Sequence, residues 1–255
     1  MSSSTESASA SGNQSLARGL QMLRLLAENG PLTATELASR LGIHQSSASR
    51  SLAVLISTGY VRKGAQGRFE CSFGVLGLAD ALAWQPFLAQ LETAVRASIR
   101  NNDYPDITIT FSMLWEHDVL HLLRSRWGRV HSLWNGGYPL NVSAPGLRLL
   151  LELPEESALA ILDRSRDRLG WGGRPEVVPE TAAGTLALAR ELLVDEVLLL
   201  DGWLRPQHAT GAIMVRTPEP SPVALAIVDE AGHLGATAHT LLLHRVRRDL
   251  EAELN

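Results

Sequence analysis

The sequence predicts an α+β protein in which an N-terminal winged helix-turn-helix is followed by a short linker helix and a C-terminal α/β domain with an antiparallel sheet. Three observations predict this architecture. Three short helical segments and a hairpin fill residues 14–72, an apolar helix occupies residues 73–85, and the remainder alternates between β-rich runs and amphipathic helices. We expect the small polar residues 1–13 to form a disordered tail and residues 86–255 to form the second domain.

The composition is that of a globular protein, because 45% of the 255 residues are hydrophobic and 20% are charged. No apolar run approaches the roughly 20 residues that span a bilayer, and the N-terminus lacks the basic and apolar regions of a secretory signal. The single cysteine, Cys71, excludes an intramolecular disulfide. We therefore expect a cytoplasmic protein with no membrane partner.

Charge is unevenly distributed along the chain. Residues 14–70 carry seven basic and three acidic side chains, whereas the rest of the chain is acidic and brings the net charge to −4. A basic segment attached to an acidic body is typical of a DNA-binding module fused to a domain that does not bind DNA.

Two helices open the predicted DNA-binding module. Residues 15–28 (SLARGLQMLRLLAE) place leucines at helical spacing, and residues 29–31 (NGP) end the helix. The motif TATE predicts a capping box, in which Thr33 accepts a hydrogen bond from the Glu36 amide while the Glu36 side chain reaches back. This second helix is expected to end at Gly42, a residue type that suits the left-handed conformation after a helix.

The third helix, residues 44–57, contains most of the serine-rich stretch GIHQSSASRSLAVL. Ala48, Leu52 and Leu55 share one helical face and predict its buried side. Short hydroxyl side chains let a helix approach the major groove closely, and arginine can bind guanine or a phosphate. The candidate DNA contacts on the second and third helices are Thr33, His44, Gln45, Ser46, Ser47, Ser49 and Arg50. A solvated helix face that merely tolerates serine is the alternative.

A hairpin is predicted in YVRKGAQGRFEC, residues 60–71, with its turn at residues 64–67. Arg62, Lys63 and Arg68 lie on or beside this wing, where they would neutralise DNA phosphates and make the affinity fall with salt. Alternatively, these charges protect the edges of a surface hairpin.

The second domain is expected to pair its strands mostly antiparallel. Pro86 opens a helix, and three strands are predicted in DITITFSML, VLHLLRSR and GRVHSLWNGGYPL. Further strands lie within GWLRPQHATGAIMVR and SPVALAIVDEAGHLGATAHTLL, and helices are predicted at about residues 145–164, 180–199 and 242–254.

The stretch YPLNVSAPGLRLLL, residues 138–151, is the strongest candidate for a ligand site. Ser143 or Ala144 would cap a helix, whose N-terminus offers free amides and a partial positive charge to a small anion. We predict a small carboxylate or aromatic ligand, with His208 across the pocket, bound by Trp134, Tyr138, Asn141, Ser143, Ala144 and His208. A purely structural helix cap is the alternative.

No sequence pattern predicts a catalytic residue, a metal site or a cofactor. His117 and His121 are four residues apart but flank a predicted turn, so they are not expected to converge on a metal. No cysteine cluster and no HExxH, GxSxG, Walker or GxGxxG pattern occurs.

Several segments together resemble the IclR family of bacterial transcriptional regulators. The N-terminal match begins with SLARGLQMLRLLAENGPLTATELASRLGIHQSSASRSLAVL, and RFECSFGVLGLADAL resembles the family's wing strand and linker helix. In the second domain, YPLNVSAPGLRLLLELPEE and DGWLRPQHATGAIMV resemble segments that border the family's effector pocket. The chain has SAPG where the family usually has Ser-Gly-Lys.

The resemblance implies a repressor that binds a pseudo-palindromic operator in double-stranded DNA as a homodimer or a dimer of dimers. It also implies that residues 86–255 form an effector-binding and oligomerisation domain that senses a small molecule. Two alternatives remain open from the residues themselves: the second domain is an enzyme with a dispersed site, or it is a ligand-free oligomerisation module.

Overall fold

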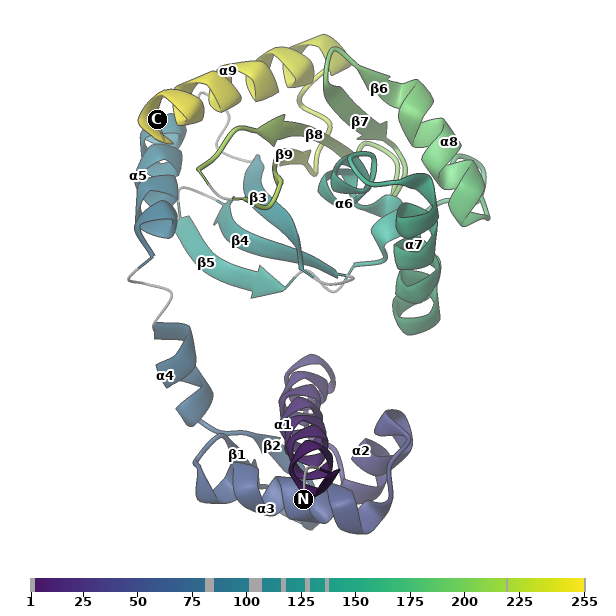
Figure 1. Ribbon diagram of the computed structural model, residues 1–255. Coiled ribbons are helices and arrows are strands. Elements are labelled where there is room, and N and C mark those ends of the chain that lie inside the picture. Colours follow the sequence, from purple (N-terminus) through teal and green to yellow (C-terminus); the bar gives the residue numbers. More distant parts are fainter. Residues whose placement is uncertain are drawn as a thin grey trace. The chain divides into compact units, whose positions relative to one another are not determined.

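The computed structural model describes residues 3–80, 85–100, 107–115, 118–126, 129–135, 138–218 and 220–254. The chain divides into two compact units, Met1–Gln85 and Pro86–Asn255 (Figure 1). Each unit has its own hydrophobic core, and we describe each by itself. Among the described residues, no helix combines the length and the hydrophobicity needed to cross a bilayer.

The N-terminal unit is a helix-turn-helix followed by a hairpin, which confirms that part of the predicted fold class. Its helices pack around a core that includes Met22, Leu37 and Leu52, and its two strands pair antiparallel. The elements are α1 (Ser3–Asn29), α2 (Ala34–Leu41), α3 (Gln45–Ser57), β1 (Val61–Lys63), η1 (Ala65–Gly67), β2 (Phe69–Cys71) and α4 (Gly74–Asp80).

Both ends of α2 are capped as the sequence predicts. Thr33 caps α2 by accepting a hydrogen bond from the Glu36 amide at 3.2 Å, and the Glu36 carboxylate accepts one from the Thr33 amide at 2.6 Å. Gly42 ends the helix with φ of 62°, a left-handed conformation that costs glycine little. The capping box and the glycine stop therefore fix the turn between α2 and α3.

Helix α1 begins earlier in the chain than the sequence predicts. Residues 1–13 were expected to be disordered, whereas α1 begins at Ser3 and runs without interruption into the predicted helix at residues 15–28. The segment contains no proline, and serine, alanine and glutamate are compatible with helical backbone, so its low complexity does not prevent a helix.

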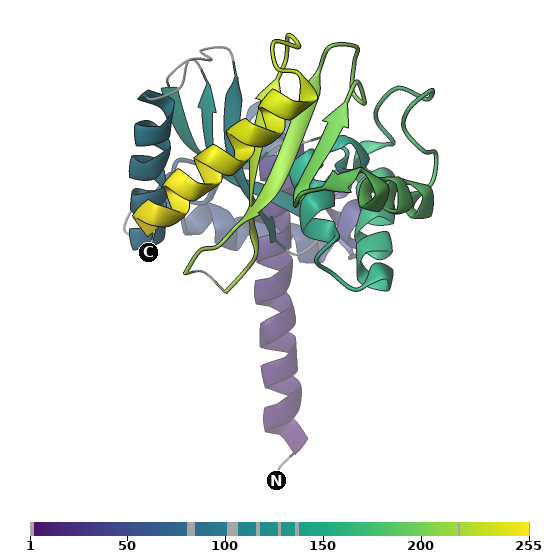
Figure 2. The same ribbon diagram turned by 90° about the horizontal axis from the view of Figure 1, so that it is seen from above.

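The C-terminal unit is a seven-stranded antiparallel sheet with helices on both faces, as the predicted fold class requires. Helices α5 and α9 pack on one face, and α9 lies diagonally across the strands (Figure 2). Helices α6, α7 and α8 share the core of the other face. The strand order is β5-β4-β3-β9-β8-β7-β6.

The bounds of these elements follow the chain from Pro86 onward. They are α5 (Pro86–Arg100), β3 (Thr108–Trp115), β4 (Asp118–Arg126), β5 (Arg129–Asn135), η3 (Leu140–Val142), α6 (Ala144–Leu150), α7 (Glu155–Leu169), α8 (Ala182–Leu192), β6 (Leu193–Val194), β7 (Val197–Asp201), β8 (Ala209–Val215), β9 (Val223–Asp229) and α9 (Ala236–Leu254).

The two faces of the central strands β3, β9 and β8 carry side chains of very different size. Because successive strand residues point to opposite faces, each strand contributes to both layers. The face toward α5 and α9 carries large apolar side chains: Ile109, Phe111, Ile213, Val215, Leu225 and Ile227. The opposite face carries mostly small or hydroxyl side chains, together with the larger Leu114, Met214 and Val228; the small or hydroxyl ones are Thr108, Thr110, Ser112, Thr210, Ala212, Ala224 and Ala226.

Three predicted helices of this unit were wrong in extent, and the last of them begins at Ala236 instead of about residue 242. The helix expected at residues 145–164 is two helices, since Pro154, which lacks the N–H that a helix interior needs, caps the start of α7. The helix expected at residues 180–199 ends at Leu192 and continues as the hairpin β6–β7. Runs of leucine and valine are compatible with either a helix or a buried strand. Here the chain reverses direction at Asp195 and Glu196 (φ of 50° and 64°), and the segments on either side of this turn pair as the hairpin.

Gly211 in β8 allows α9 to approach the sheet closely, which generates a stability prediction. A Cβ atom there would lie 2.7 Å from Leu243 Cδ1 and 2.9 Å from His239 Nε2, both on α9. We expect Gly211→Ala to lower the free energy of unfolding by about 1–3 kcal/mol through overpacking, measured by urea denaturation of the full chain. Gly235→Ala, where nothing lies within 4 Å, is the control and should change stability by less than about 0.5 kcal/mol. Equal unfolding midpoints for the two variants would contradict this account.

Candidate functional site

The first candidate site is the exposed face of α3. Ala48, Leu52 and Leu55 are buried in the core of the unit, as the helical periodicity predicts, which leaves the serine-rich face toward solvent. Gln45, Ser46, Ser49 and Arg50 are exposed, and Ser47 is half-buried.

The start of α3 is organised by its capping residue. His44 caps the helix, with its Nδ1 atom 3.3 Å from the Ser46 amide and 2.9 Å from the Ser46 hydroxyl. The Arg50 guanidinium lies 3.4 Å from the Ser47 hydroxyl one turn earlier. Two pairs of the residues predicted to contact DNA, His44 with Ser46 and Ser47 with Arg50, are therefore linked by hydrogen bonds near the start of α3.

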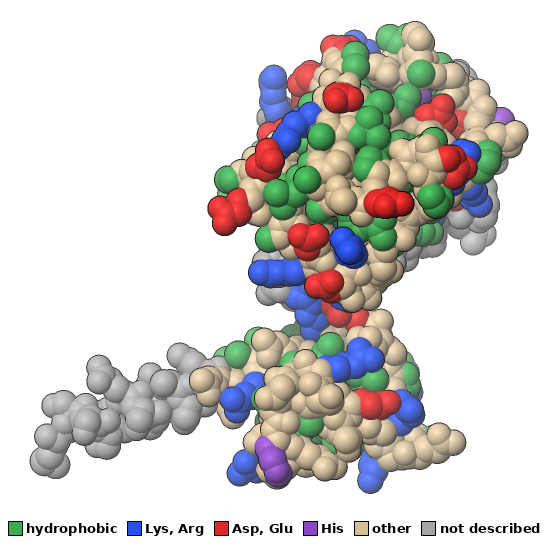
Figure 3. All heavy atoms as spheres, turned by 90° about the vertical axis from the view of Figure 1, so that its right-hand side faces the viewer, with side chains coloured by type: hydrophobic (Ala, Val, Ile, Leu, Met, Phe, Trp, Pro, Cys, Tyr) green, Lys and Arg blue, Asp and Glu red, His purple; other side chains and the backbone are tan. Residues whose placement is uncertain are grey.

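The three predicted wing cations have different surroundings. Arg62 pairs with Glu70, its cross-strand partner, at 2.8 Å and lies over the Phe73 ring at 5.7 Å. Lys63 and Arg50 have no acidic partner among the residues that the structure describes. On the face of the N-terminal unit that Figure 3 shows, basic side chains lie among mostly uncharged ones.

Arg68 and Thr33 serve the fold of the N-terminal unit. Arg68 donates to the Pro31 carbonyl at 2.8 Å and pairs with Glu36 at 3.3 Å, so it ties the hairpin to the start of α2. Hydrogen bonds from Thr33 hold the pKa of the Glu36 carboxyl below its usual value. Both residues were predicted to bind DNA, and any such contact would compete with these internal bonds.

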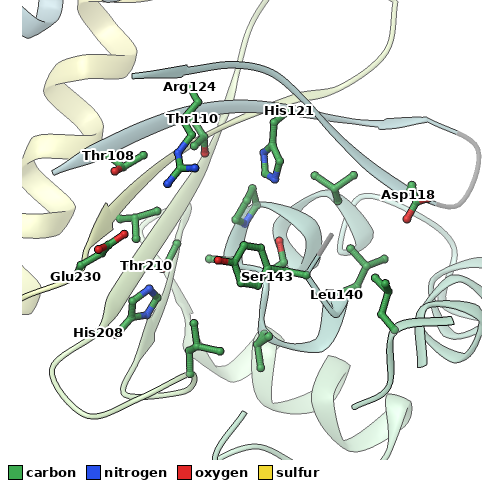
Figure 4. Close-up of a pocket in the computed structure, with 18 of the residues that line it drawn as sticks. Thr108, Thr110, Asp118, His121, Arg124, Leu140, Ser143, His208, Thr210 and Glu230 are labelled. Atoms are coloured by element: carbon green, nitrogen blue, oxygen red, sulfur yellow. The ribbon is translucent and has the colours of Figure 1, made fainter. Parts of the chain in front are cut away.

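The second candidate site is a cavity of about 320 Å³ in the C-terminal unit. Its floor is the small-residue face of β3, β9 and β8, its wall is β4, and its cover comes from η3, the start of α6 and the end of α7. In Figure 4, Arg124 and His121 point into the cavity from β4, and His208 and Glu230 lie opposite them.

A β-bulge places two β4 side chains in this cavity. Phe111 pairs with Leu123, but the next residue, Ser112, pairs with His121, so Leu122 is an extra residue in β4. Strict alternation would put His121 and Arg124 on opposite faces, whereas the bulge brings both to the cavity and buries Leu122 and Leu123 together in the α9 core. The sequence signal is weak, since two adjacent leucines between polar residues do not specify a bulge.

The β4 wall presents an uncharged histidine beside an arginine. Ser112 Oγ lies 2.7 Å from His121 Nδ1, so this ring nitrogen is hydrogen-bonded to a side chain of the neighbouring strand β3. Burial first, and the charge of Arg124 second, lower the pKa of His121 to about 4. Near neutral pH, His121 therefore offers the cavity a neutral imidazole.

On the side of the floor away from β4, His208 and an ion pair line the cavity, and Glu230 of this pair lies two residues beyond Val228, the cross-strand partner of Thr108. Arg205 and Glu230 approach to 3.7 Å. Burial first, and the charge of Arg205 second, lower the pKa of His208 below its usual value. His208 is consequently a second histidine of this cavity that is uncharged near neutral pH.

An ion pair between α7 and β4 lines the cavity. Arg168, at the end of α7, forms a two-point ion pair with Asp118 at the start of β4, and both residues line the cavity. Tyr138 lies at the cavity lining with 54% of its surface exposed.

Four of the six predicted effector residues line the cavity, and a fifth, Asn141, is buried beside it. Tyr138, Ser143, Ala144 and His208 all line the cavity. Asn141 is only 1% exposed and is not among the described lining residues, since its amide donates to the Gly172 carbonyl at 2.7 Å and accepts from the Gly172 amide at 3.1 Å.

Two further residues lie beyond what the structure describes. Trp134 belongs to β5, of which only the backbone is described, and His117 lies outside the described residues. Within the described ranges, no group of three or more histidine, cysteine, aspartate or glutamate side chains is arranged to hold a metal ion.

Comparisons with known proteins match both parts of the chain. Residues 15–65 match the model of the IclR helix-turn-helix domain. Over 166 residues the chain is 30% identical to the transcriptional repressor IclR of Escherichia coli (strain K12), an alignment covering 59% of this chain and 57% of that protein.

Solved structures share the fold over nearly the whole chain. A Brucella abortus IclR family transcriptional regulator superposes with a TM-score of 0.74 at 19% identity and covers 95% of this chain and 93% of its own. A Microbacterium hydrocarbonoxydans IclR homolog complexed with 4-hydroxybenzoate has a TM-score of 0.63 at 18% identity, covering 94% of this chain and 98% of its own.

The lowered pKa of His121 generates a pH prediction. Between about pH 4 and 6.5 the unfolded chain protonates this histidine while the folded chain does not, so stability should rise with pH across that window. We expect His121→Gln to make the rise shallower, by up to about 1.4 kcal/mol per pH unit for one proton, measured by urea unfolding at several pH values.

Above pH 7, where His121 is uncharged in both folded and unfolded chains, the curves of the two proteins should run parallel. Equal slopes between pH 4.5 and 6.5 would show that His121 is not a buried, uncharged group in the folded state.

Proposed function

Residues 15–65 form a helix-turn-helix domain of the IclR type, and from this premise we propose that the protein is a DNA-binding transcriptional repressor controlled by a small molecule. The observation that carries the proposal is the exposed face of α3, whose serines and Arg50 lie opposite its buried stripe. We place the protein in the cytoplasm as a homodimer or dimer of dimers on a pseudo-palindromic operator.

The chemistry of α3 suits the major groove. Ser46 and Ser49 leave little bulk between the helix backbone and the base edges, and their hydroxyls donate or accept hydrogen bonds. Arg50 can bind guanine through two hydrogen bonds or hold a phosphate. In a helix-turn-helix, the N-terminal residues of the second helix meet the bases, and these side chains lie at that end of α3.

The hairpin adds a contact that is independent of sequence. Lys63 is exposed on β1, where its ammonium can neutralise a phosphate of the backbone. Arg68 contributes indirectly, because it holds the hairpin against the start of α2 through Pro31 and Glu36. The wing is thus positioned by one arginine and presents a different cation to DNA.

The cavity supports effector control of this DNA binding. Its volume of about 320 Å³ falls at the small end of known ligand sites, and its described lining mixes apolar side chains with hydroxyl, imidazole and charged groups. The Microbacterium hydrocarbonoxydans homolog of the same fold was solved with 4-hydroxybenzoate. Bound effector would shift the population between DNA-competent and DNA-incompetent forms, which requires different ligand affinities in the two forms.

The role of Arg50 is tested with an operator selected from a random DNA pool. We expect Arg50→Ala to weaken operator binding by between about fivefold and 150-fold, since a base contact of this kind contributes about 1–3 kcal/mol, and fluorescence anisotropy measures the change. Arg190→Ala on α8 removes the same charge in the other unit and is the matched control, expected to bind with unchanged affinity. Unchanged operator affinity in Arg50→Ala would contradict the assignment of α3.

A further inference from the structure

The start of α6 has little capacity left to bind an anion, although the sequence predicted an anion site there. The Gly146 amide donates to Ser143 Oγ at 3.2 Å, and the Leu147 amide donates to the Ser143 carbonyl at 2.8 Å. Pro145 has no N–H, and the nearby Asn141 amide is engaged by Gly172. At this helix start the Ala144 amide is the remaining candidate, so an anion in the cavity finds most of its donors elsewhere.

The sheet floor and the β4 wall supply those donors. Arg124 pairs across the strands with Thr110, and Thr108 lies two residues further along β3 on the same face. All three side chains line the cavity at one end (Figure 4). A guanidinium carries five N–H donors in a fixed plane, and it recognises carboxylates better than any other side chain does.

The hydroxyl of Thr108 points independently to a ligand. Thr108 is 1% exposed, and its Oγ1 atom has no hydrogen-bond partner among the residues that the structure describes. A buried polar atom left without a partner costs about 1–3 kcal/mol. Because Thr108 lines the cavity, a bound oxygen atom would satisfy this hydroxyl.

The charges of the described lining residues favour a monoanion. Three guanidinium groups (Arg124, Arg168 and Arg205) face two carboxylates (Asp118 and Glu230). Both lining histidines are uncharged near neutral pH, so they do not alter this balance. The described lining thus carries one excess positive charge, which a single carboxylate neutralises and two carboxylates exceed.

The cover of the cavity contributes four apolar side chains. Leu140, Val142, Leu169 and Leu204 face the space from η3, α7 and the loop before β8. A cavity of about 320 Å³ accommodates a benzoate, with its polar end on the sheet and its apolar body against these side chains.

We infer that the ligand is a small monocarboxylate with a compact apolar body, whose carboxylate binds Arg124 and Thr108 on the sheet instead of the start of α6. The inference rests on the proposed function only in taking the cavity as a ligand site. The bulge at Leu122 is what makes the arrangement possible, since it turns Arg124 toward Thr110 and Thr108.

Three probes of one shape test the ligand class on the full chain by titration calorimetry. Benzoate should bind at least tenfold more tightly than benzamide, its neutral isostere, and more tightly than terephthalate, which carries a second carboxylate. Equal affinity for benzoate and benzamide, tighter binding of terephthalate, or no detectable binding of benzoate at millimolar concentration would each overturn the inference.

Three variants test the position of the carboxylate. Arg124→Gln should lower the affinity for benzoate at least tenfold while changing the affinity for benzamide less than threefold. Thr108→Val should lower the affinity for benzoate severalfold without loss of stability, because it removes a hydroxyl that has no described partner. Ser143→Ala should change both probes by the same factor. Arg190→Gln, which removes a charge far along the chain on α8, is the control.

Loss of the preference for benzoate in Ser143→Ala, or its retention in Arg124→Gln and Thr108→Val, places the anion at α6 and overturns the inference. Operator binding by the ligand-free protein is measured separately, so failure of the proposed repressor function is distinguishable from failure of these ligand assignments.

Discussion

The central strands of the sheet must bury both of their faces, and this requirement shapes the candidate ligand site. One face of β3, β9 and β8 packs large side chains such as Phe111 and Ile227 against α9. The other face carries threonine and alanine, as at Thr110 and Ala226, so the helices that cover it do not fill the space. Because side chains alternate between the two faces of these strands, the layer on one face is densely packed and the layer on the other contains the cavity.

The bulge in β4 gives the cavity of this layer two polar side chains and makes it a candidate recognition site. One extra residue at Leu122 sends two leucines into the α9 core and two polar side chains, His121 and Arg124, into the cavity. Ser112 then holds His121, and burial keeps its imidazole neutral. The wall therefore offers a candidate ligand the guanidinium of Arg124 and the neutral imidazole of His121, while its acidic residue, Asp118, pairs with Arg168.

Local chemistry made much of the N-terminal unit predictable from the sequence. The capping box at Thr33, the glycine at residue 42 and the buried stripe from Ala48 to Leu55 each depend on residues within four positions of one another. The roles of Arg68 and Asn141 depend on partners 32 and 31 residues away, which no local pattern reveals. Arg124 was missed for the same reason, because its direction depends on the register between β3 and β4.

The most direct test of this account is a crystal structure of the full chain with benzoate bound. The account predicts the carboxylate oxygens at about 2.8 Å from the Arg124 guanidinium and within hydrogen-bond distance of Thr108 Oγ1, with the ring against Leu140 and Val142. A carboxylate bound to the backbone at the start of α6, with Arg124 and Thr108 making no contact to it, would contradict the account.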